Sequence, residues 1–272
     1  MNPWLLGALG LVAIAVGLLL PRLRLRAALR RPFPDAWEAF LHQNLPVYQQ
    51  LSTQEQQQLR QHTKQFLHEK LFSGAGGLEI NDEIRVTIAA SACLLVLKRA
   101  SVFPGLRYIV VYPSTFVVNR AQADQAGVVG PGERTLLGES WQSGKVILAW
   151  DSVLGGARNF EDGHNVVLHE FAHQLDSETG SANGAPLLGG ASSYAAWAAV
   201  LAPEFHALQE DERRGRRSLI DHYGATNPAE FFAVATETFF EQPAAMAREH
   251  QALYAALERY YRVDPRHWHA QG

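Results

Sequence analysis

The spacing of apolar positions changes several times along the chain. The segment 52–72 opens with Ser52 and Glu55, a capping-box pair, and its apolar residues then recur at helical spacing. A glycine-rich interruption follows at 74–77. Ile84–Lys98 is apolar nearly all round, which is typical of a buried helix. This part of the chain is therefore predicted to form two helices.

In the middle of the chain the pattern becomes that of strands. Short runs rich in β-branched and aromatic residues lie at 108–113, 115–118 and 145–150, bounded by Gly, Pro and polar residues. Helical spacing then returns in four segments: Gly163–Leu175, Tyr194–Glu210, Pro228–Phe240 and Ala244–Tyr261. Strands followed by helices predict an α+β fold with a small mixed sheet rather than a doubly wound one.

The N-terminus carries a different signal. Trp4–Leu20 is 17 residues without a charge, and at about 1.5 Å per residue a helix of that length just spans a bilayer core. No Lys or Arg precedes it, whereas five arginines follow between residues 22 and 31, which favours a cytoplasm-facing anchor over a cleaved signal peptide. We expect an anchor at 1–21 with the membrane contacted through residues 4–20, a basic linker at 22–36, and one domain at 37–272.

Composition adds few constraints. The net charge of −3 gives no reason to expect nucleic acid as a partner, and the basic run 213–217 has no interleaved aromatic residues, so we interpret it as a solvated helix end. The single cysteine, Cys93, cannot form an internal disulfide and fits a reducing compartment. The expected location is the bacterial inner membrane with the domain in the cytoplasm, and the alternative is a cytoplasmic protein.

The chemistry centres on the stretch HEFAHQLD. His169 and His173 lie one helical turn apart, so both rings can face one metal ion, and Glu170 lies between them. The other residues from Val166 to Leu175 carry no charge, so the helix is expected to be buried. Buried imidazoles need partners, and one Zn²⁺ per chain would supply them. Glu170 is then placed to act as general base.

The third ligand is less clearly marked. Glu230 opens a largely apolar helix behind Asn227 and Pro228, and it is the strongest candidate because a His–His pair needs a third hard ligand. The same spacing is that of a capping box, so Glu230 could instead satisfy a backbone N–H. His222 stays open as a ligand. Asp176 lies too far along the helix and is assigned to orienting a ligand histidine or ending the helix.

These motifs resemble a known family. HEFAHQLD (residues 169–176) together with YGATNPAEFFAV (residues 223–234) is similar to the Mlc titration factor A family of bacterial zinc peptidases, and at motif level to the catalytic domain of anthrax lethal factor. The resemblance implies a zincin-like metallopeptidase fold, with zinc held by His169, His173 and Glu230, Glu170 as general base, and Tyr223 as the transition-state partner. It also implies aminopeptidase-like hydrolysis of a peptide or protein substrate.

Three further expectations concern an alternative function, the surroundings of the metal site and the loop that follows the histidine helix. The alternative function is a membrane-tethered module that sequesters a transcriptional regulator, a partner that the family resemblance suggests. Glu237 lies seven residues after Glu230 and either supports the metal site or faces solvent. The glycine- and serine-rich loop at 177–192 follows the histidine helix and is a candidate cover for the cleft.

Overall fold

The protein, seen here as a computed structural model, is described over residues 3–115 and 144–269. Most of the second predicted strand segment, residues 116–118, lies outside these ranges. The α-helices described are α1 (Pro3–Arg30), α2 (Asp35–Asn44), α3 (Thr53–Glu69), α4 (Asp82–Leu94), α7 (Trp150–Arg158), α8 (Val166–Asp176), α9 (Ala191–Arg214), α10 (Pro228–Glu241), α11 (Pro243–Glu249) and α12 (Gln251–Tyr261). Four short 3₁₀ turns are η1 (Pro46–Gln50), η2 (Ser177–Thr179), η3 (His222–Ala225) and η4 (Pro265–Trp268).

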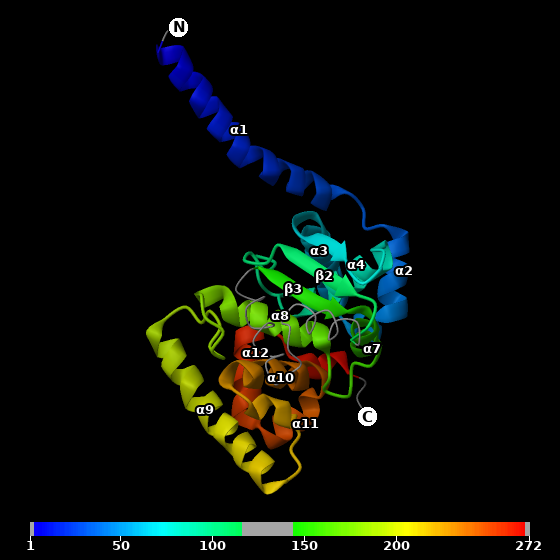
Figure 1. The fold of residues 1–272 in the computed structure, drawn as a ribbon, viewed down its shortest axis with the longest axis vertical. Coiled ribbons are helices and arrows are strands. Elements are labelled where there is room, and N and C mark those ends of the chain that lie inside the picture. Colours follow the sequence, from blue (N-terminus) through cyan, green and yellow to red (C-terminus); the bar gives the residue numbers. More distant parts are fainter. Residues whose placement is uncertain (1–2, 116–143, 270–272) are drawn as a thin grey trace.

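A small sheet lies at the centre of the domain. Strands β1 (Leu71–Gly74), β2 (Tyr108–Tyr112) and β3 (Lys145–Ala149) are hydrogen-bonded in that order, and all are parallel. Within the described strands, the predicted mixed sheet is therefore wrong. The mainly helical chain with a small parallel sheet is a mixed α/β arrangement, in which helices also precede and separate the strands (Figure 1).

Strand β1 was not predicted, because its residues were assigned to the end of the preceding helix. That helix, α3, begins with the predicted capping box at Ser52 and Glu55, but it ends at Glu69. Leu71 then pairs with Tyr108 of β2. The long predicted helix 244–261 is likewise two helices, α11 and α12, which are separated at His250.

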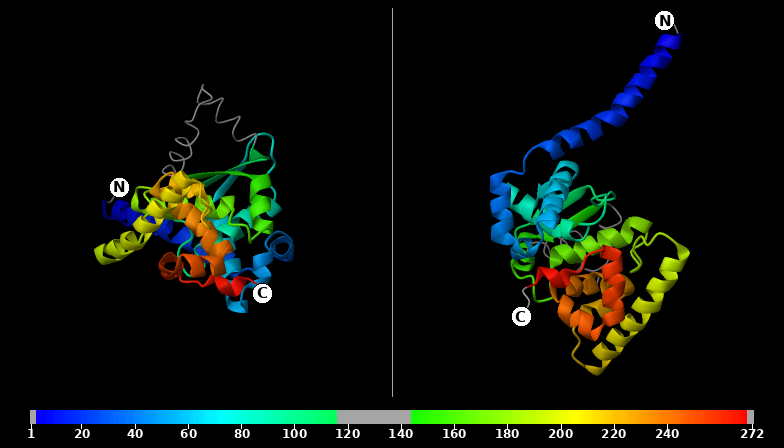
Figure 2. Two further views of the ribbon diagram at one scale, coloured as in Figure 1. Left: turned by 90° about the horizontal axis from the view of Figure 1, so that it is seen from below. Right: turned by 180° about the vertical axis from the view of Figure 1, so that it is seen from behind.

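The histidine helix α8 lies between the sheet and the C-terminal helices. Its Phe171 meets Phe103 with ring centroids 4.9 Å apart and Phe66 of α3 at 5.7 Å, so one face of α8 is fixed in the core. The opposite face packs against α10 (Figure 1). Helix α9 runs along the outside of this C-terminal group, as both views of Figure 2 also show.

Helix α1 extends away from the domain (Figure 1 and the right-hand view of Figure 2). Its end is fixed to α3, where the ammonium group of Lys64 donates hydrogen bonds to the carbonyls of Leu29 and Arg31. Among the residues that the structure describes, no helix is long and apolar enough to cross a membrane. This finding gives the predicted span at 4–20 no support, and most of the side chains of that span lie outside the described part.

Candidate metal centre

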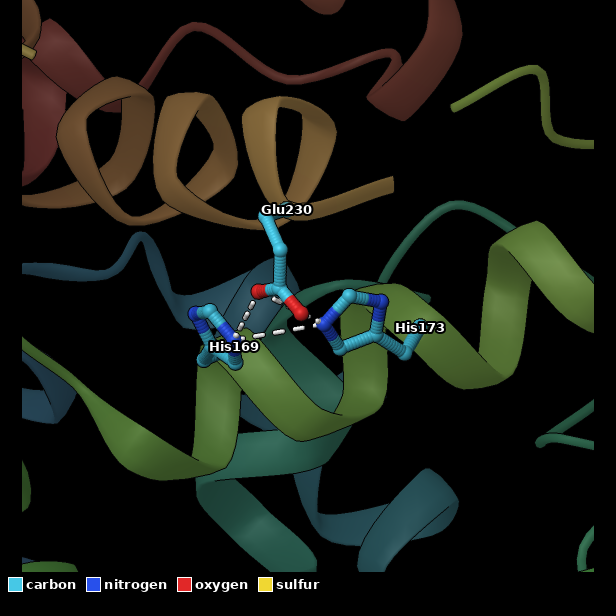
Figure 3. A group of neighbouring side chains, drawn as sticks. All are labelled: His169, His173 and Glu230. Atoms are coloured by element: carbon cyan, nitrogen blue, oxygen red, sulfur yellow. Dashed lines mark hydrogen bonds and ion pairs between the residues drawn. The ribbon is translucent and has the colours of Figure 1, made fainter. Parts of the chain in front are cut away.

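Asn165 sets the start of the histidine helix. As the N-cap of α8, its side-chain oxygen accepts hydrogen bonds from the backbone N–H groups of Val167 and Leu168, each at 3.1 Å. Such a cap fixes where the first turn begins. Because Leu168, Phe171 and other apolar residues of α8 are buried, the helix is also fixed in rotation. His169 and His173 consequently face α10 (Figure 3).

Glu230 comes from the first turn of α10 and points at both histidines (Figure 3). The cap of this helix is Asn227, whose side-chain oxygen accepts the N–H groups of Ala229 at 2.9 Å and Glu230 at 3.0 Å. The carboxylate of Glu230 contacts the two histidine rings instead of closing a capping box. The Asn-x-x-Glu sequence therefore forms a simple Asn cap, and the glutamate side chain points towards the two histidines.

Three potential ligand atoms converge. Oε2 of Glu230 lies 3.1 Å from Nε2 of His169 and 3.4 Å from Nε2 of His173, and the two Nε2 atoms are 3.2 Å apart. Ligand atoms about 2.1 Å from a tetrahedral ion lie about 3.4 Å from one another, so this triangle has nearly the size that Zn²⁺ requires. His169, His173 and Glu230 could hold a metal ion.

Glu237 supports the first of these ligands. Its Oε1 lies 2.8 Å from Nδ1 of His169, and its Oε2 accepts the backbone N–H of Asn165 at 2.5 Å. If Nδ1 carries the proton, Nε2 keeps its lone pair and faces the other two ligand atoms. A carboxylate on the outer nitrogen of a ligand histidine is a regular feature of metal sites. Glu237 is buried, so it does not face solvent.

The electrostatics of the group favour a cation. Burial lowers the pKa of His169, but hydrogen bonds to Glu230 and Glu237 outweigh burial and raise it to about 10. Burial raises the pKa of Glu230, and its contacts with both histidines lower it to about 2. Burial lowers the pKa of His173 to about 4. The contact with Glu230 opposes this shift, and the charge of His169 adds to it. The two carboxylates thus favour a positive charge in this group, carried by a proton on His169 or by a bound metal ion.

An open groove runs beside the ligand group. It is lined by His169 and Glu237 together with Glu170, Tyr223 and a few residues of neighbouring elements. The turn η3 positions Tyr223, because Asp221 caps the turn by accepting the Tyr223 N–H at 2.7 Å. The ring centroids of Tyr223 and His169 are 5.9 Å apart. The two residues predicted to take part in the reaction therefore lie on the same groove as the first ligand.

Two other candidates are placed differently. Asp176, the last residue of α8, accepts the backbone N–H of Gly184 at 2.7 Å, and so it holds the following loop. Burial raises the pKa of Asp176 to about 6, opposed by the backbone donors of residues 183–185. Among the described residues, the potential metal-binding group does not include His222 or Asp176. The loop is also fixed through the Gly184 carbonyl, which accepts from Nε1 of Trp197 at 2.8 Å.

The sequence reasoning missed Asn165 and Glu241. The Asn165 amide donates to Oε1 of Glu241 at 2.9 Å, and the other oxygen of Glu241 accepts the N–H of Gly163 at 2.9 Å. Burial raises the pKa of Glu241 to about 8, against the hydrogen bond from Asn165. The available signal was the spacing of Glu237 and Glu241, which puts two acids one turn apart on a helix that is otherwise apolar.

The chain is similar in sequence to known proteins over most of its length. The sequence profile of the family described as glucose-regulated metallo-peptidase M90 matches residues 20–262. An uncharacterized protein of Synechocystis is 42 % identical over 87 % of this chain and 86 % of its own. Mlc titration factor A of Klebsiella pneumoniae is 35 % identical over 84 % of this chain and 86 % of its own. Mlc titration factor A of Serratia proteamaculans is 34 % identical over 81 % of this chain and 85 % of its own.

Proposed function

Because the chain belongs to the glucose-regulated metallo-peptidase M90 family, with Mlc titration factor A proteins among its relatives, we propose that it is a zinc-dependent peptidase. The observation that carries the proposal is the triangle formed by His169, His173 and Glu230, whose sides are 3.1, 3.4 and 3.2 Å. Two imidazoles and one carboxylate leave a fourth position open, which is the ligand set of catalytic rather than structural zinc.

Each residue of the site has a chemical role in this proposal. His169, His173 and Glu230 would hold the ion, which when bound polarises a carbonyl and lowers the pKa of water to about 7. The Glu170 carboxylate accepts the proton of the attacking water and delivers it to the leaving amine. The Tyr223 hydroxyl donates a hydrogen bond to the oxygen on which negative charge develops. Glu237 keeps the His169 ring in the orientation that binding needs.

The test separates binding from hydrolysis. Zinc per chain and the cleavage of a peptide library are measured for the wild type and for Glu170→Gln, Tyr223→Phe and Glu230→Ala. We expect Glu170→Gln to abolish hydrolysis with zinc retained, Tyr223→Phe to slow it about 10²–10³-fold, and Glu230→Ala to lose zinc. Undiminished turnover by Glu170→Gln would refute the mechanism. Full zinc in Glu230→Ala would remove Glu230 from the ligand set.

The proposed cleavage is aminopeptidase-like, a choice supported by the family resemblance alone. Such an enzyme needs an acidic group for the free amine of its substrate, and the acids lining the groove in the described residues are Glu170 and Glu237. Matched peptides with free and acetylated N-termini provide the test. Loss of cleavage on acetylation supports an aminopeptidase, and equal cleavage of both shows an endopeptidase.

A second function is favoured by the names of the relatives. Several are called Mlc titration factor A, which describes titration of the regulator Mlc by those proteins. We propose that this chain likewise binds a transcriptional regulator, independently of hydrolysis. Binding to a purified regulator by the Glu170→Gln variant, at wild-type affinity, is the expected result. Absence of any complex with either form would refute this proposal.

We also propose that α1 tethers the domain to a membrane, with the domain in the cytoplasm. The support is the uncharged run 4–20, the arginines that follow it, and the exposed apolar side chains of α1, which include Trp4 at 85 % and Leu19 at 53 %. Fractionation of cells expressing the full chain and a fragment from Trp37 tests the tether. Full-length protein should sediment with membranes and resist salt, whereas equal distribution of both would refute it.

A further inference from the structure

A second cavity, distinct from the groove of the candidate metal site, lies between residues 98–101, which follow α4, the start of α9 and the end of α12. Its volume is about 730 Å³, and it shares no lining residue with the groove that contains His169 and Glu170. A ligand in this cavity would therefore not be the peptide that the proposed reaction consumes. The properties of its wall indicate which kind of ligand it would take.

The charge of the wall is one-sided. Lys98, Arg99, Arg259 and Arg262 line the cavity, and among the residues that the structure describes no acidic one does. The Arg99 guanidinium is neutralised by Glu178, to whose two carboxylate oxygens it donates hydrogen bonds of 3.2 and 2.9 Å. Nζ of Lys98 lies 3.8 Å from Oε1 of Glu55. Within the described ranges, neither Arg259 nor Arg262 has a carboxylate within ion-pair distance. Two arginines, both exposed, thus remain to bind an anion.

The N-terminus of α9 adds donors at the same place. This helix has 24 residues, its N-cap is Gly190, and it has neither a capping side chain nor an acidic residue in the first turn. Ser192 and Ser193 of that turn line the cavity. The first N–H groups of a helix carry a partial positive charge and commonly bind phosphate oxygens. Serine hydroxyls beside them supply further donors.

The remaining wall is aromatic and apolar. Trp197 and Tyr260 line it with ring centroids 5.6 Å apart, and Leu187, which is 52 % exposed, lies at its edge. The Tyr260 hydroxyl is buried, and no hydrogen-bond partner for it exists among the described atoms. The volume exceeds the requirement of an inorganic ion and is in the range of small-molecule sites. The wall thus offers both a place for an anion and a surface for a ring.

We propose that this cavity binds a small organic phosphate, whose phosphate group lies between Arg259, Arg262 and the start of α9 and whose ring lies against Trp197 and Tyr260. Planar arginine side chains bind phosphate oxygens in pairs, and two arginines together match the two charges of a phosphate dianion better than the one charge of a carboxylate. The ligand is a phosphate monoester of a small cyclic compound, and it binds whether or not the metal site is filled.

The experiment is a calorimetric titration of the full chain at low salt with phenyl phosphate, inorganic phosphate and phenol. We expect saturable binding of phenyl phosphate at one per chain, weaker binding of inorganic phosphate, and no binding of phenol. The titration is repeated after dialysis against a chelator, because phosphates also bind metal ions. Binding that disappears with the metal would place the ligand on the metal site and overturn the proposal.

The residues are tested with the double variant Arg259→Gln and Arg262→Gln. Its matched control is Arg213→Gln with Arg217→Gln, which removes the same charge from the end of α9 and from the turn that follows it. We expect at least tenfold weaker phenyl phosphate binding in the first pair and less than a twofold change in the second. Equal weakening in both pairs would show a general effect of net charge, and no weakening in the first would place the ligand elsewhere. Either result refutes the site.

Discussion

Replacing Glu237 by Gln tests whether this carboxylate determines the form of His169 that can bind a metal. Both oxygens of Glu237 accept hydrogen bonds, one from Nδ1 of His169 at 2.8 Å and one from the N–H of Asn165 at 2.5 Å. A glutamine has only one acceptor oxygen at this place. If that oxygen keeps the Asn165 N–H, the amide NH₂ faces Nδ1 and favours the tautomer with the proton on Nε2, which cannot ligate.

If the glutamine turns the other way, its NH₂ group meets the Asn165 N–H, and a buried donor is left unsatisfied. That outcome costs about 1–3 kcal/mol of stability. Removing such an outer partner of a ligand histidine lowers metal affinity about 10–100-fold, which corresponds to about 1.4–2.8 kcal/mol. We therefore expect Glu237→Gln to lower either the zinc affinity by this factor or the free energy of unfolding by this amount.

The assay is competition for zinc against a chromophoric chelator, combined with urea unfolding of the metal-free protein. Glu241→Gln is the matched control, because it makes the same change one turn along α10 and the Glu241 carboxylate contacts Gly163 and Asn165, not His169. Its zinc affinity should stay within about threefold of the wild type on this reasoning. Wild-type zinc affinity together with wild-type stability in Glu237→Gln would refute the assigned role of this residue.

Three other predictions follow from the same contacts. Zinc binding at pH 7 should release about one proton, because the pKa of His169 without metal is raised to about 10. Binding heats measured in two buffers with different ionisation enthalpies count that proton. A binding heat that does not depend on the buffer would contradict this prediction. Burial raises the pKa of Glu241 to about 8 from its ordinary value of 4.5, so the protonated form is favoured in the folded state. The stability that Glu241 contributes is complete below pH 4.5 and is lost as the pH rises towards 8. Unfolding of wild type and Glu241→Gln across that range should therefore diverge, and parallel curves would refute the shift. Gly184→Ala should destabilise the fold more than Gly180→Ala. Both glycines have positive φ, but only at Gly184 would the new Cβ come within 2.3 Å of the Pro228 carbonyl oxygen. Thermal unfolding of the two variants compares them, and equal losses of stability would contradict the close contact.

The sequence predicted the motif better than its surroundings. His169, Glu170 and His173 are recognisable because helical periodicity fixes their relation without knowledge of the rest of the fold. Glu230 was open to two interpretations, since a capping box and a ligand use the same spacing. The contacts of its carboxylate with His169 and His173 distinguish them. The direction of the strands was not predictable, because it depends on the path of the connections.

Contacts between segments far apart in the sequence were the hardest features to predict. Asn165 and Glu241 are 76 positions apart, and no local pattern shows that they meet. Asp176 was assigned either to orienting a ligand histidine or to ending the helix. It is the last residue of α8, and its carboxylate accepts the N–H of Gly184 in the following loop. Burial of these polar groups could be expected from the apolar sequence around them, but the identity of their partners is a property of how α8 and α10 pack.

That packing explains why three acids lie along one apolar helix. Glu230, Glu237 and Glu241 are separated by seven and four residues, so they follow one stripe of α10. Glu230 meets the ligand rings, Glu237 meets His169 and the start of α8, and Glu241 holds the cap residue Asn165. Each buried carboxylate needs its donors, and those donors come together only when α8 and α10 are in contact. The candidate metal site and the helix interface therefore depend on the same contacts, so a metal ion bound there in the folded state would also stabilise the contact between these two helices.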